Sequence, residues 1–324
     1  MTELALIGDI GGTNARFALT DLSTPVPQIL QERTFGDDQF ATLQDAASSY
    51  LRQASVKPVR ATLAVASPVT SDEIVFTNRA WSFKRSDLQR ALGLDHLEVI
   101  NDFGAIGWAA PHLDASRRVA MYGEIRDTLQ SPVTLIGPGT GLGMGLVIGS
   151  PEQGWRVVEN EGGHASFAPV DEQEREIVRW IAARHRRVYN ELLLSGSGLS
   201  RIDAALRGVP PTSLPAPQEG LREPKEIVDA ALRGNDADAL RALDRFCRTF
   251  GGVAGDAAML HGARTVLIAG GIVLHFLDYF RGSGFMQRFL DRADYTPYMQ
   301  RMTVQVITHP NPGLLGAAVA ARQS

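Results

Sequence analysis

Cysteine is nearly absent from this chain. Its 324 residues include a single cysteine, Cys247. One thiol cannot close an intramolecular disulfide, and it cannot supply a cysteine-rich structural zinc site. This composition fits a reducing compartment, so we expect a cytoplasmic location.

An excess of positive charge is also lacking. The 32 Lys and Arg residues are outnumbered by 36 Asp and Glu residues, which gives a formal net charge of −4. Domains that bind nucleic acids usually have the opposite balance, so we expect no nucleic-acid partner. Glu3 and Asp9 precede the first basic residue, Arg16, and we therefore expect no signal peptide.

No hydrophobic run is suited to a membrane. The uncharged segment 128–151 is interrupted by six glycines, three prolines and six polar residues, which makes it too polar to span a bilayer. We expect two strands around a loop in this segment and no membrane partner.

The sequence does contain strand-like and helix-like segments, mixed over a length that suits about two domains. Strands are predicted at 4–7, 15–20, 61–66, 74–76, 97–100, 133–136, 144–148, 265–269 and 303–307. Helices are predicted at 41–53, 103–110, 172–188, 225–233, 236–262 and 313–323. This mixture predicts an α/β fold. We expect a small α/β domain of residues 1–112 plus 309–324 and a large α/β domain of residues 113–308.

Two apolar runs end in a glycine-rich turn that carries a threonine, and a second apolar run follows each turn. The first turn is Gly8–Asn14 and the second is Gly137–Gly143. The P-loop motif and the G-x-G-x-x-G dinucleotide motif are both absent. Successive N–H groups of such turns form an anion site, to which Thr13 and Thr140 add hydroxyl donors. Either turn alone could be an ordinary hairpin, but the pair predicts a ligand with several phosphates.

Asp9 in the first turn would repel phosphate. The Asp9 carboxylate can instead serve as a ligand for Mg²⁺ bound beside a nucleotide, since this cation takes carboxylate ligands directly or through water. We therefore expect Asp9 to hold Mg²⁺ through water. A third glycine pair, Gly270-Gly271, follows the predicted strand 265–269 and by itself is a weak signal.

The motifs as a set resemble the bacterial glucokinase family of the actin-like ATPase and sugar-kinase superfamily. Residues 9–16 and 137–143 resemble the two phosphate motifs of this superfamily, and residues 269–271 its adenosine motif. The resemblance extends over nearly the whole chain through residues 76–78, 100–103, 161–164, 194–196 and 309–316. The single cysteine excludes the zinc motif of the related repressors and kinases, so the chain resembles the non-zinc glucokinases.

The resemblance implies a two-domain actin-like ATPase (ribonuclease H-like) fold with a hinged interdomain cleft, in many members as a homodimer. It implies ATP-dependent phosphorylation of the 6-hydroxyl of glucose, the entry step of glycolysis, with ATP and Mg²⁺ bound. The residues that match nucleotide-binding positions are Gly8, Asp9, Ile10, Gly11, Gly12, Thr13, Asn14, Gly139, Thr140, Gly141, Gly270 and Gly271.

The same resemblance assigns Asp102 as the general base. Contacts to glucose are expected from Asp102 itself and from Asn78, Asn101, Glu161, His164 and Glu191. Taken singly, these residues have simpler interpretations: Asp102 as a helix N-cap, Glu161 as a turn residue and Glu191 as a surface charge. Two other functions also stay open: a kinase for another hexose and a non-catalytic sugar sensor.

Overall fold

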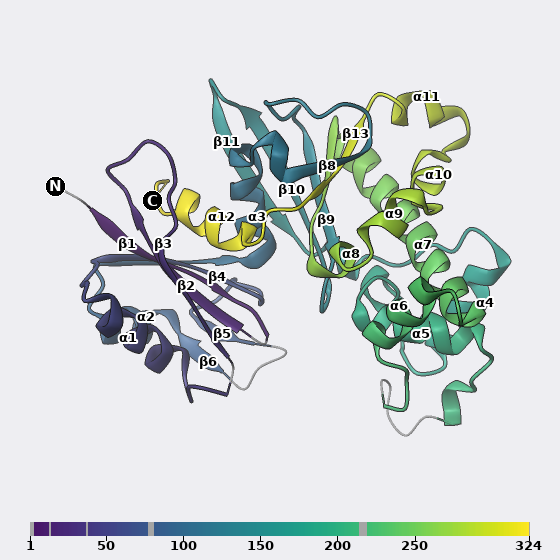
Figure 1. The fold of residues 1–324 in the computed structure, drawn as a ribbon, viewed down its shortest axis with the longest axis horizontal. Helices are drawn as coiled ribbons and strands as arrows, with labels where there is room; N and C mark the ends of the chain where they lie inside the picture. The colour runs from purple at the N-terminus through teal and green to yellow at the C-terminus, as the bar shows by residue number, and fades with distance from the viewer. Residues whose placement is uncertain (1–2, 13, 37, 77–80, 214–218, 324) are drawn as a thin grey trace. The chain divides into compact units, whose positions relative to one another are not determined.

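The computed structural model describes residues 3–12, 14–36, 38–76, 81–213 and 219–323. The chain divides into two compact units. The first comprises Met1–Leu113, Gly154–Glu159 and His309–Ser324, and the second comprises Asp114–Gln153 and Asn160–Thr308. Helices and sheets are combined in both units, as Figure 1 shows.

A five-stranded sheet with the order β3-β2-β1-β4-β7 forms the centre of the first unit. Strands β1, β4 and β7 run parallel to one another, whereas β2 and β3 are antiparallel neighbours. The strands are β1 (Leu4–Ile10), β2 (Asn14–Asp21), β3 (Leu30–Gly36), β4 (Arg60–Val65) and β7 (His96–Asn101). The helices are α1 (Leu43–Ala54), α2 (Arg85–Leu92), α3 (Asp102–Ala109) and α12 (Pro312–Ala320), and β5 (Glu73–Val75) pairs with β6 (Ser82–Lys84).

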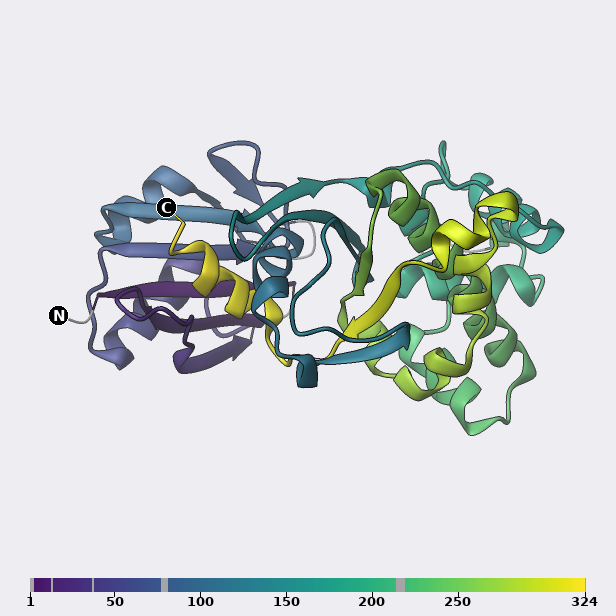
Figure 2. The same cartoon turned by 90° about the horizontal axis from the view of Figure 1, so that it is seen from above.

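Helices cover both faces of this sheet because its central strand is apolar on both sides. Side chains alternate between the two faces of a strand. Leu6 of β1 packs in the cluster that contains residues of α1 and α2, whereas the next residue, Ile7, packs against Leu314 and Ala317 of α12. Figure 1 shows α1 and α2 on one side of the strands and α12 on the other, and in Figure 2 the yellow C-terminal helix lies over the purple and blue strands.

The second unit contains the strand order β10-β9-β12-β13-β8. Strands β9, β12 and β13 are parallel, and β10 and β8 are antiparallel to their neighbours. The strands are β8 (Arg118–Tyr122), β9 (Val133–Pro138), β10 (Leu142–Ser150), β12 (Thr265–Ile268) and β13 (Thr303–Ile307).

Helices of the second unit pack into one apolar core. The longest is α7, which begins after the N-cap Asp236 and ends where Gly262 adopts a φ of 59°, a conformation that glycine adopts at little cost. Phe246 and Phe250 of α7 are fully buried beside Phe285 of α10. The helices are α4 (Glu172–Ala182), α5 (Gly196–Leu206), α6 (Pro224–Arg233), α7 (Ala237–His261), α8 (Gly271–Leu274), α9 (Leu277–Gly282), α10 (Phe285–Leu290) and α11 (Thr296–Met299).

All nine predicted strands and all six predicted helices are present, so the α/β prediction is confirmed. One helix end was wrong, because α4 stops at Ala182 instead of continuing to residue 188. Beyond it, Tyr189 forms a β-bridge with Ser166, and this pairing requires extended backbone. The sequence patterns missed β3, β6, β8 and β11 (Gly154–Asn160), and they also missed the helices α2, α5, α8, α9, α10 and α11. Strand β3 is at the edge of its sheet and is mostly exposed, so it lacks the apolar pattern of a buried strand.

Candidate active site

The first glycine-rich turn joins two antiparallel strands, β1 and β2, as expected. Asp9 is paired with Arg16 across this hairpin, and their charged atoms are 3.5 Å apart. The Asp9 side chain is 19% exposed, and burial raises its pKa above the usual value although Arg16 opposes this effect. Gly313, near the start of α12, comes so close that an added Cβ would be 3.1 Å from the Asp9 carboxylate.

The other predicted nucleotide residues of the first unit are distributed along the same hairpin. Gly8 and Ile10 are buried within β1, while Gly11, Gly12 and Asn14 form the turn, where the Gly11 N–H donates to the Asn14 carbonyl at 2.9 Å. Thr13 lies outside the described residues, as does the predicted sugar contact Asn78.

Asn101 and Asp102 mark the junction of β7 and α3. The N-cap of α3 is Asn101, whose side-chain oxygen accepts hydrogen bonds from the N–H groups of Phe103 at 2.8 Å and Gly104 at 3.3 Å. Asp102 is the first residue of the helix, so its interpretation as the N-cap was wrong. The tertiary structure assigns the cap to the neighbouring amide.

Asp9 and Asp102 come to the same edge of the first sheet. Ile10 of β1 is level with Val65 of β4, and Val65 is level with Asn101 of β7. Because these strands are parallel, their carboxyl ends meet at one edge. The pKa of Asp102 is raised to about 7, mainly by burial; the hydrogen bond from the Phe103 N–H lowers it, and the carboxylates of Asp9 and Glu159 raise it. Asp102 is therefore poised to take up a proton near neutral pH.

The second glycine-rich turn is also a hairpin, formed by β9 and β10. The Gly139 N–H donates to the Gly141 carbonyl at 2.7 Å within the turn, and Thr140 between them is exposed. Gly270 lies beside this hairpin with a φ of 95°, and an added Cβ would meet the Pro138 carbonyl at 2.5 Å. Gly271 follows as the first residue of α8. The adenosine-type glycine pair and the second phosphate-type turn are thus neighbours within the second unit.

The second unit also brings Glu161, His164 and Glu191 together. His164 Nδ1 is 3.9 Å from a carboxylate oxygen of Glu161, and His164 Nε2 is 3.9 Å from one of Glu191. The Glu161 side chain is 67% exposed and the Glu191 side chain 28%, so both carboxylates are available to a ligand. A group of two carboxylates and an imidazole can accept and donate several hydrogen bonds, as recognition of a sugar requires.

Two residues that the sequence did not single out contact the predicted sugar-binding residues. The Tyr189 ring stacks on His164, with ring centroids 4.8 Å apart and planes at 19°. Glu159 accepts a hydrogen bond of 3.2 Å from the Asn101 N–H, next to Asp102. No local signal in the sequence could have identified either residue, because each acts on a residue from a different element.

The described part of the chain contains no group of three or more His, Cys, Asp or Glu side chains arranged to hold a metal ion. Mg²⁺ is commonly bound by one or two carboxylates together with waters and substrate phosphates, so the single carboxylate of Asp9 fits an ion held in that way. Across the same described residues, a membrane-spanning helix is also absent.

Comparisons with known proteins agree with this arrangement. A model of the glucokinase family matches residues 6–324. A curated glucokinase from Yersinia pestis is 40% identical over 324 residues, which cover 100% of this chain and 98% of that protein. A solved glucokinase structure from an Antarctic psychrotroph is 32% identical, with a TM-score of 0.84 and 100% of both chains covered. A glucokinase from Balamuthia mandrillaris, solved in complex with glucose, is 20% identical with a TM-score of 0.78 over 100% of this chain and 94% of that chain, and so shares the fold.

The hairpin turns, the two α/β units and the structural neighbours define a protein of the two-domain actin-like ATPase and sugar-kinase class. Within this class, the chain belongs to the glucokinase family. The fold and the family predicted from the motifs are both confirmed, and the chain is an enzyme of the kinase type.

Proposed function

We propose that this chain transfers the γ-phosphate of ATP to the 6-hydroxyl of glucose, with Asp102 as the general base. The observation that carries the proposal is the position of Asp102, at the carboxyl edge of the first sheet, with a pKa raised to about 7 by burial. An aspartate with the usual low pKa would be a weaker base. Asn101 forms the helix cap, while Asp102 Oδ1 accepts a hydrogen bond of 2.8 Å from the Phe103 N–H, so Oδ2 is the oxygen proposed to receive the hydroxyl proton.

The proton and the phosphoryl group move in opposite directions in this reaction. The 6-hydroxyl oxygen forms a bond to the γ-phosphorus while the bond from that phosphorus to the β,γ-bridging oxygen breaks, and ADP leaves. The hydroxyl proton goes to the Asp102 carboxylate. Positioning and charge stabilisation dominate catalysis of phosphoryl transfer, and a positioned base contributes about 10²–10⁴-fold.

The two glycine-rich turns and the Gly270-Gly271 pair are the proposed nucleotide-binding elements. Their backbone N–H groups and the exposed hydroxyl of Thr140 are suited to phosphate oxygens. Thr13 belongs to the same proposal by its place in the sequence. Bound Mg²⁺ would neutralise charge on the phosphates, and Asp9 is the residue proposed to hold it through water.

Glucose recognition is proposed for Asn101, Asp102, Glu161, His164 and Glu191, with Asn78 as a further contact. Carboxylates form strong hydrogen bonds to hydroxyl donors, and the exposure of Glu161 leaves its oxygens available for them. The His164 imidazole can donate or accept, according to its tautomer.

The domains, the assembly and the location complete the proposal. We propose residues 1–112 plus 309–324 and residues 113–308 as the two functional domains, a homodimer as the assembly and the cytoplasm as the location. The family resemblance supports the first two, and the single buried free thiol of Cys247 supports the third. Sedimentation velocity tests the assembly, since a monomer at working concentrations would contradict it.

The experiment is a measurement of ADP release with ATP, Mg²⁺ and a panel of hexoses, for the wild type and two variants. Asp102→Asn removes the base, and we expect turnover of glucose to fall by about 10²–10⁴-fold. Asp87→Asn is the matched control, because Asp87 is likewise an aspartate in the first turn of a helix of the first unit. Wild-type turnover in Asp102→Asn would contradict the role of the base. Glucose binding without turnover would favour a sugar sensor. Faster turnover of another hexose would show that this hexose, and not glucose, is the preferred substrate.

A further inference from the structure

Glu191 uses its two carboxylate oxygens differently. Oε2 accepts a hydrogen bond of 2.8 Å from the backbone N–H of Leu142, the residue of the second glycine-rich turn with which β10 begins. Oε1 is the oxygen that lies 3.9 Å from His164 Nε2. One side chain therefore joins a proposed nucleotide-binding turn to a proposed sugar-binding histidine, and all of these residues belong to the second unit.

The glycine at position 141 is required by this contact. A Cβ added there would overlap Oε2 of Glu191. Gly139, two residues earlier in the same turn, has a different environment, since the nearest atom to an added Cβ would be the Gly141 carbonyl oxygen at 4.0 Å. Within this turn, a side chain at position 141 would therefore meet Glu191, whereas one at position 139 would not.

The segment that carries Glu161 and His164 is seated on the same stretch of chain. A Cβ added at Gly163 would overlap the carbonyl oxygen of Leu142, so the two backbones are in close contact. The neighbouring Gly162 contacts the segment that carries Glu191, because Asn190 Nδ2 donates to the Gly162 carbonyl oxygen at 3.3 Å. The N–H and the carbonyl of Leu142 therefore contact both proposed sugar-binding segments.

We propose that the turn Gly139–Leu142 positions Glu191 for the sugar, so that the binding of nucleotide phosphates and the binding of glucose are energetically coupled through the Leu142 N–H. The inference rests on the proposed function of the same site. Leu142 and Gly141 act as positioning residues, because they reach the sugar through Glu191. A displacement of the turn displaces the carboxylate, and coupling of this kind acts equally in both directions.

The first test measures glucose affinity without nucleotide, by isothermal titration calorimetry on the full chain. We expect Gly141→Ala to weaken glucose binding about tenfold or more, the effect of losing one well-placed hydrogen bond to a charged group. Gly282→Ala, in α9 of the same unit, is the control and leaves the glucose affinity within about twofold, since an added Cβ there meets nothing within 4 Å. Equal affinities of the two variants would overturn the inference.

A double-mutant cycle distinguishes positioning of Glu191 from a general disturbance of the turn. In a Glu191→Ala background the overlap is removed, so Gly141→Ala has no further effect on glucose affinity. An unchanged effect of Gly141→Ala in that background would show that the turn acts by another route and would overturn the proposal.

The reverse direction needs no change at Gly141 and therefore still tests the proposal if that variant fails to fold. We expect Glu191→Ala to weaken ADP binding in the absence of sugar, because Leu142 loses its acceptor. Glu191→Gln, which keeps a carbonyl oxygen for the Leu142 N–H, retains more of the ADP affinity. Unchanged ADP binding in Glu191→Ala would overturn the coupling. Turnover of glucose by the wild-type protein, measured in parallel, tests the proposed function separately from the coupling.

Discussion

The backbone N–H of Asn101 donates a hydrogen bond of 3.2 Å to the carboxylate of Glu159, directly before the helix that begins with Asp102. Glu159 comes from β11, and its carboxylate fills the space where a side chain at Gly104 would be. A helix N-terminus stabilises a carboxylate. The same carboxylate is a neighbouring negative charge for Asp102, and it raises the pKa of that residue together with burial and Asp9.

A first prediction concerns the pH dependence of the rate. Asp102 must be ionised to accept a proton, and its pKa is raised to about 7. We expect kcat/KM at low concentrations of both substrates to fall about tenfold for each pH unit below that pKa, because this parameter reports the free enzyme. Initial rates in overlapping buffers measure the profile, and a flat profile from about pH 5 to about pH 8 would contradict the role of Asp102.

The same pKa affects stability with a defined sign. A carboxyl whose pKa is higher in the folded state than in the unfolded chain binds its proton more tightly when folded. The contribution of Asp102 to the free energy of unfolding is therefore greatest at low pH, and it falls as the pH rises from about 4 to about 7. Urea unfolding of wild type and Asp102→Asn across that range measures the difference.

A second prediction concerns Glu159. In Glu159→Gln the amide oxygen still accepts from the Asn101 N–H, but the negative charge is removed. The pKa of Asp102 falls, so the acidic limb of the kcat/KM profile moves to lower pH. Glu152→Gln serves as the control, because Glu152 lies in the turn before β11 and hydrogen-bonds Ser150. If both variants keep the wild-type profile, Glu159 does not act on Asp102.

A third prediction tests the contact between α3 and α12 in the first unit. A Cβ at Gly316 of α12 would overlap the carbonyl oxygen of Ala105 in α3. Gly316→Ala therefore forces the two helices apart, and we expect a loss of about 1–3 kcal/mol in the free energy of unfolding. Denaturant unfolding measures it. Gly282→Ala is the control, because an added Cβ at the end of α9 meets nothing within 4 Å. A loss of the same size in both variants would argue against this contact as the cause.

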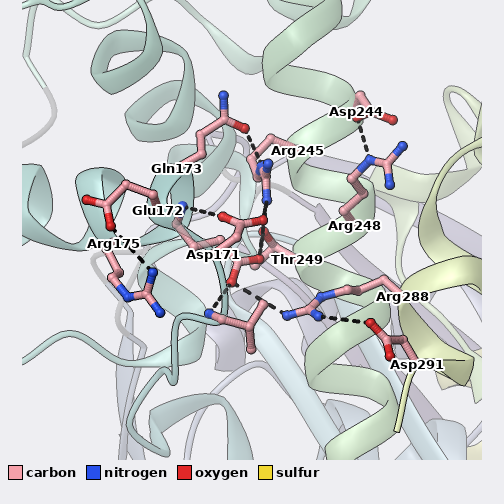
Figure 3. Close-up of polar contacts among 12 residues, drawn as sticks. Asp171, Glu172, Gln173, Arg175, Asp244, Arg245, Arg248, Thr249, Arg288 and Asp291 are labelled. Carbon is pink, nitrogen blue, oxygen red and sulfur yellow. Dashed lines mark hydrogen bonds and ion pairs between the residues drawn. The ribbon is translucent and has the colours of Figure 1, made fainter. Parts of the chain in front are cut away.

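A fourth prediction concerns the buried carboxylate of Glu174, which is 1% exposed. It accepts a hydrogen bond of 2.9 Å from the Val170 N–H and lies 3.6 Å from Arg245 and 3.7 Å from Arg288. Figure 3 shows that the two arginines extend toward the start of α4 from α7 and α10. Asp171 and Gln173 also accept hydrogen bonds from Arg245. The carboxylate thus connects α4 to both helices.

Glu174→Gln removes this charge and leaves two partly buried arginines without it. We expect a loss on the order of 3 kcal/mol in the free energy of unfolding. Its neighbour provides the control, since Glu172 is 62% exposed and pairs with Arg175 and Arg179 at the surface. Exposed ion pairs contribute little, so Glu172→Gln leaves the unfolding curve nearly unchanged. Thermal unfolding of both variants measures the two losses. Equal losses in the two variants would contradict a structural role for the buried carboxylate of Glu174.

The buried strands could be predicted from the sequence because their signal is local. Strand β1 has four apolar residues before a glycine turn, and residues 133–136 include three apolar residues before the second turn. The exposed edge strand β3 could not be predicted, because pairing with β2 defines it and not an apolar pattern of its own. The end of the helix after Glu172 was misplaced for a similar reason, since the bridge from Tyr189 to Ser166 is a tertiary contact.

The sequence by itself determined which chemical groups this glucokinase-family chain carries and the order in which they occur. The glycine-rich turns and Asp9 are recognisable from residue types and spacing, whereas Asp102 and residues 161–164 are assigned roles through the family resemblance. Only the tertiary structure decided how those groups are tuned: that Asn101 caps the helix, that Glu159 faces Asp102 and that Leu142 holds Glu191. Burial, charge and backbone contacts between residues far apart in the chain set pKa values and orientations, and these quantities exist only after the chain has folded.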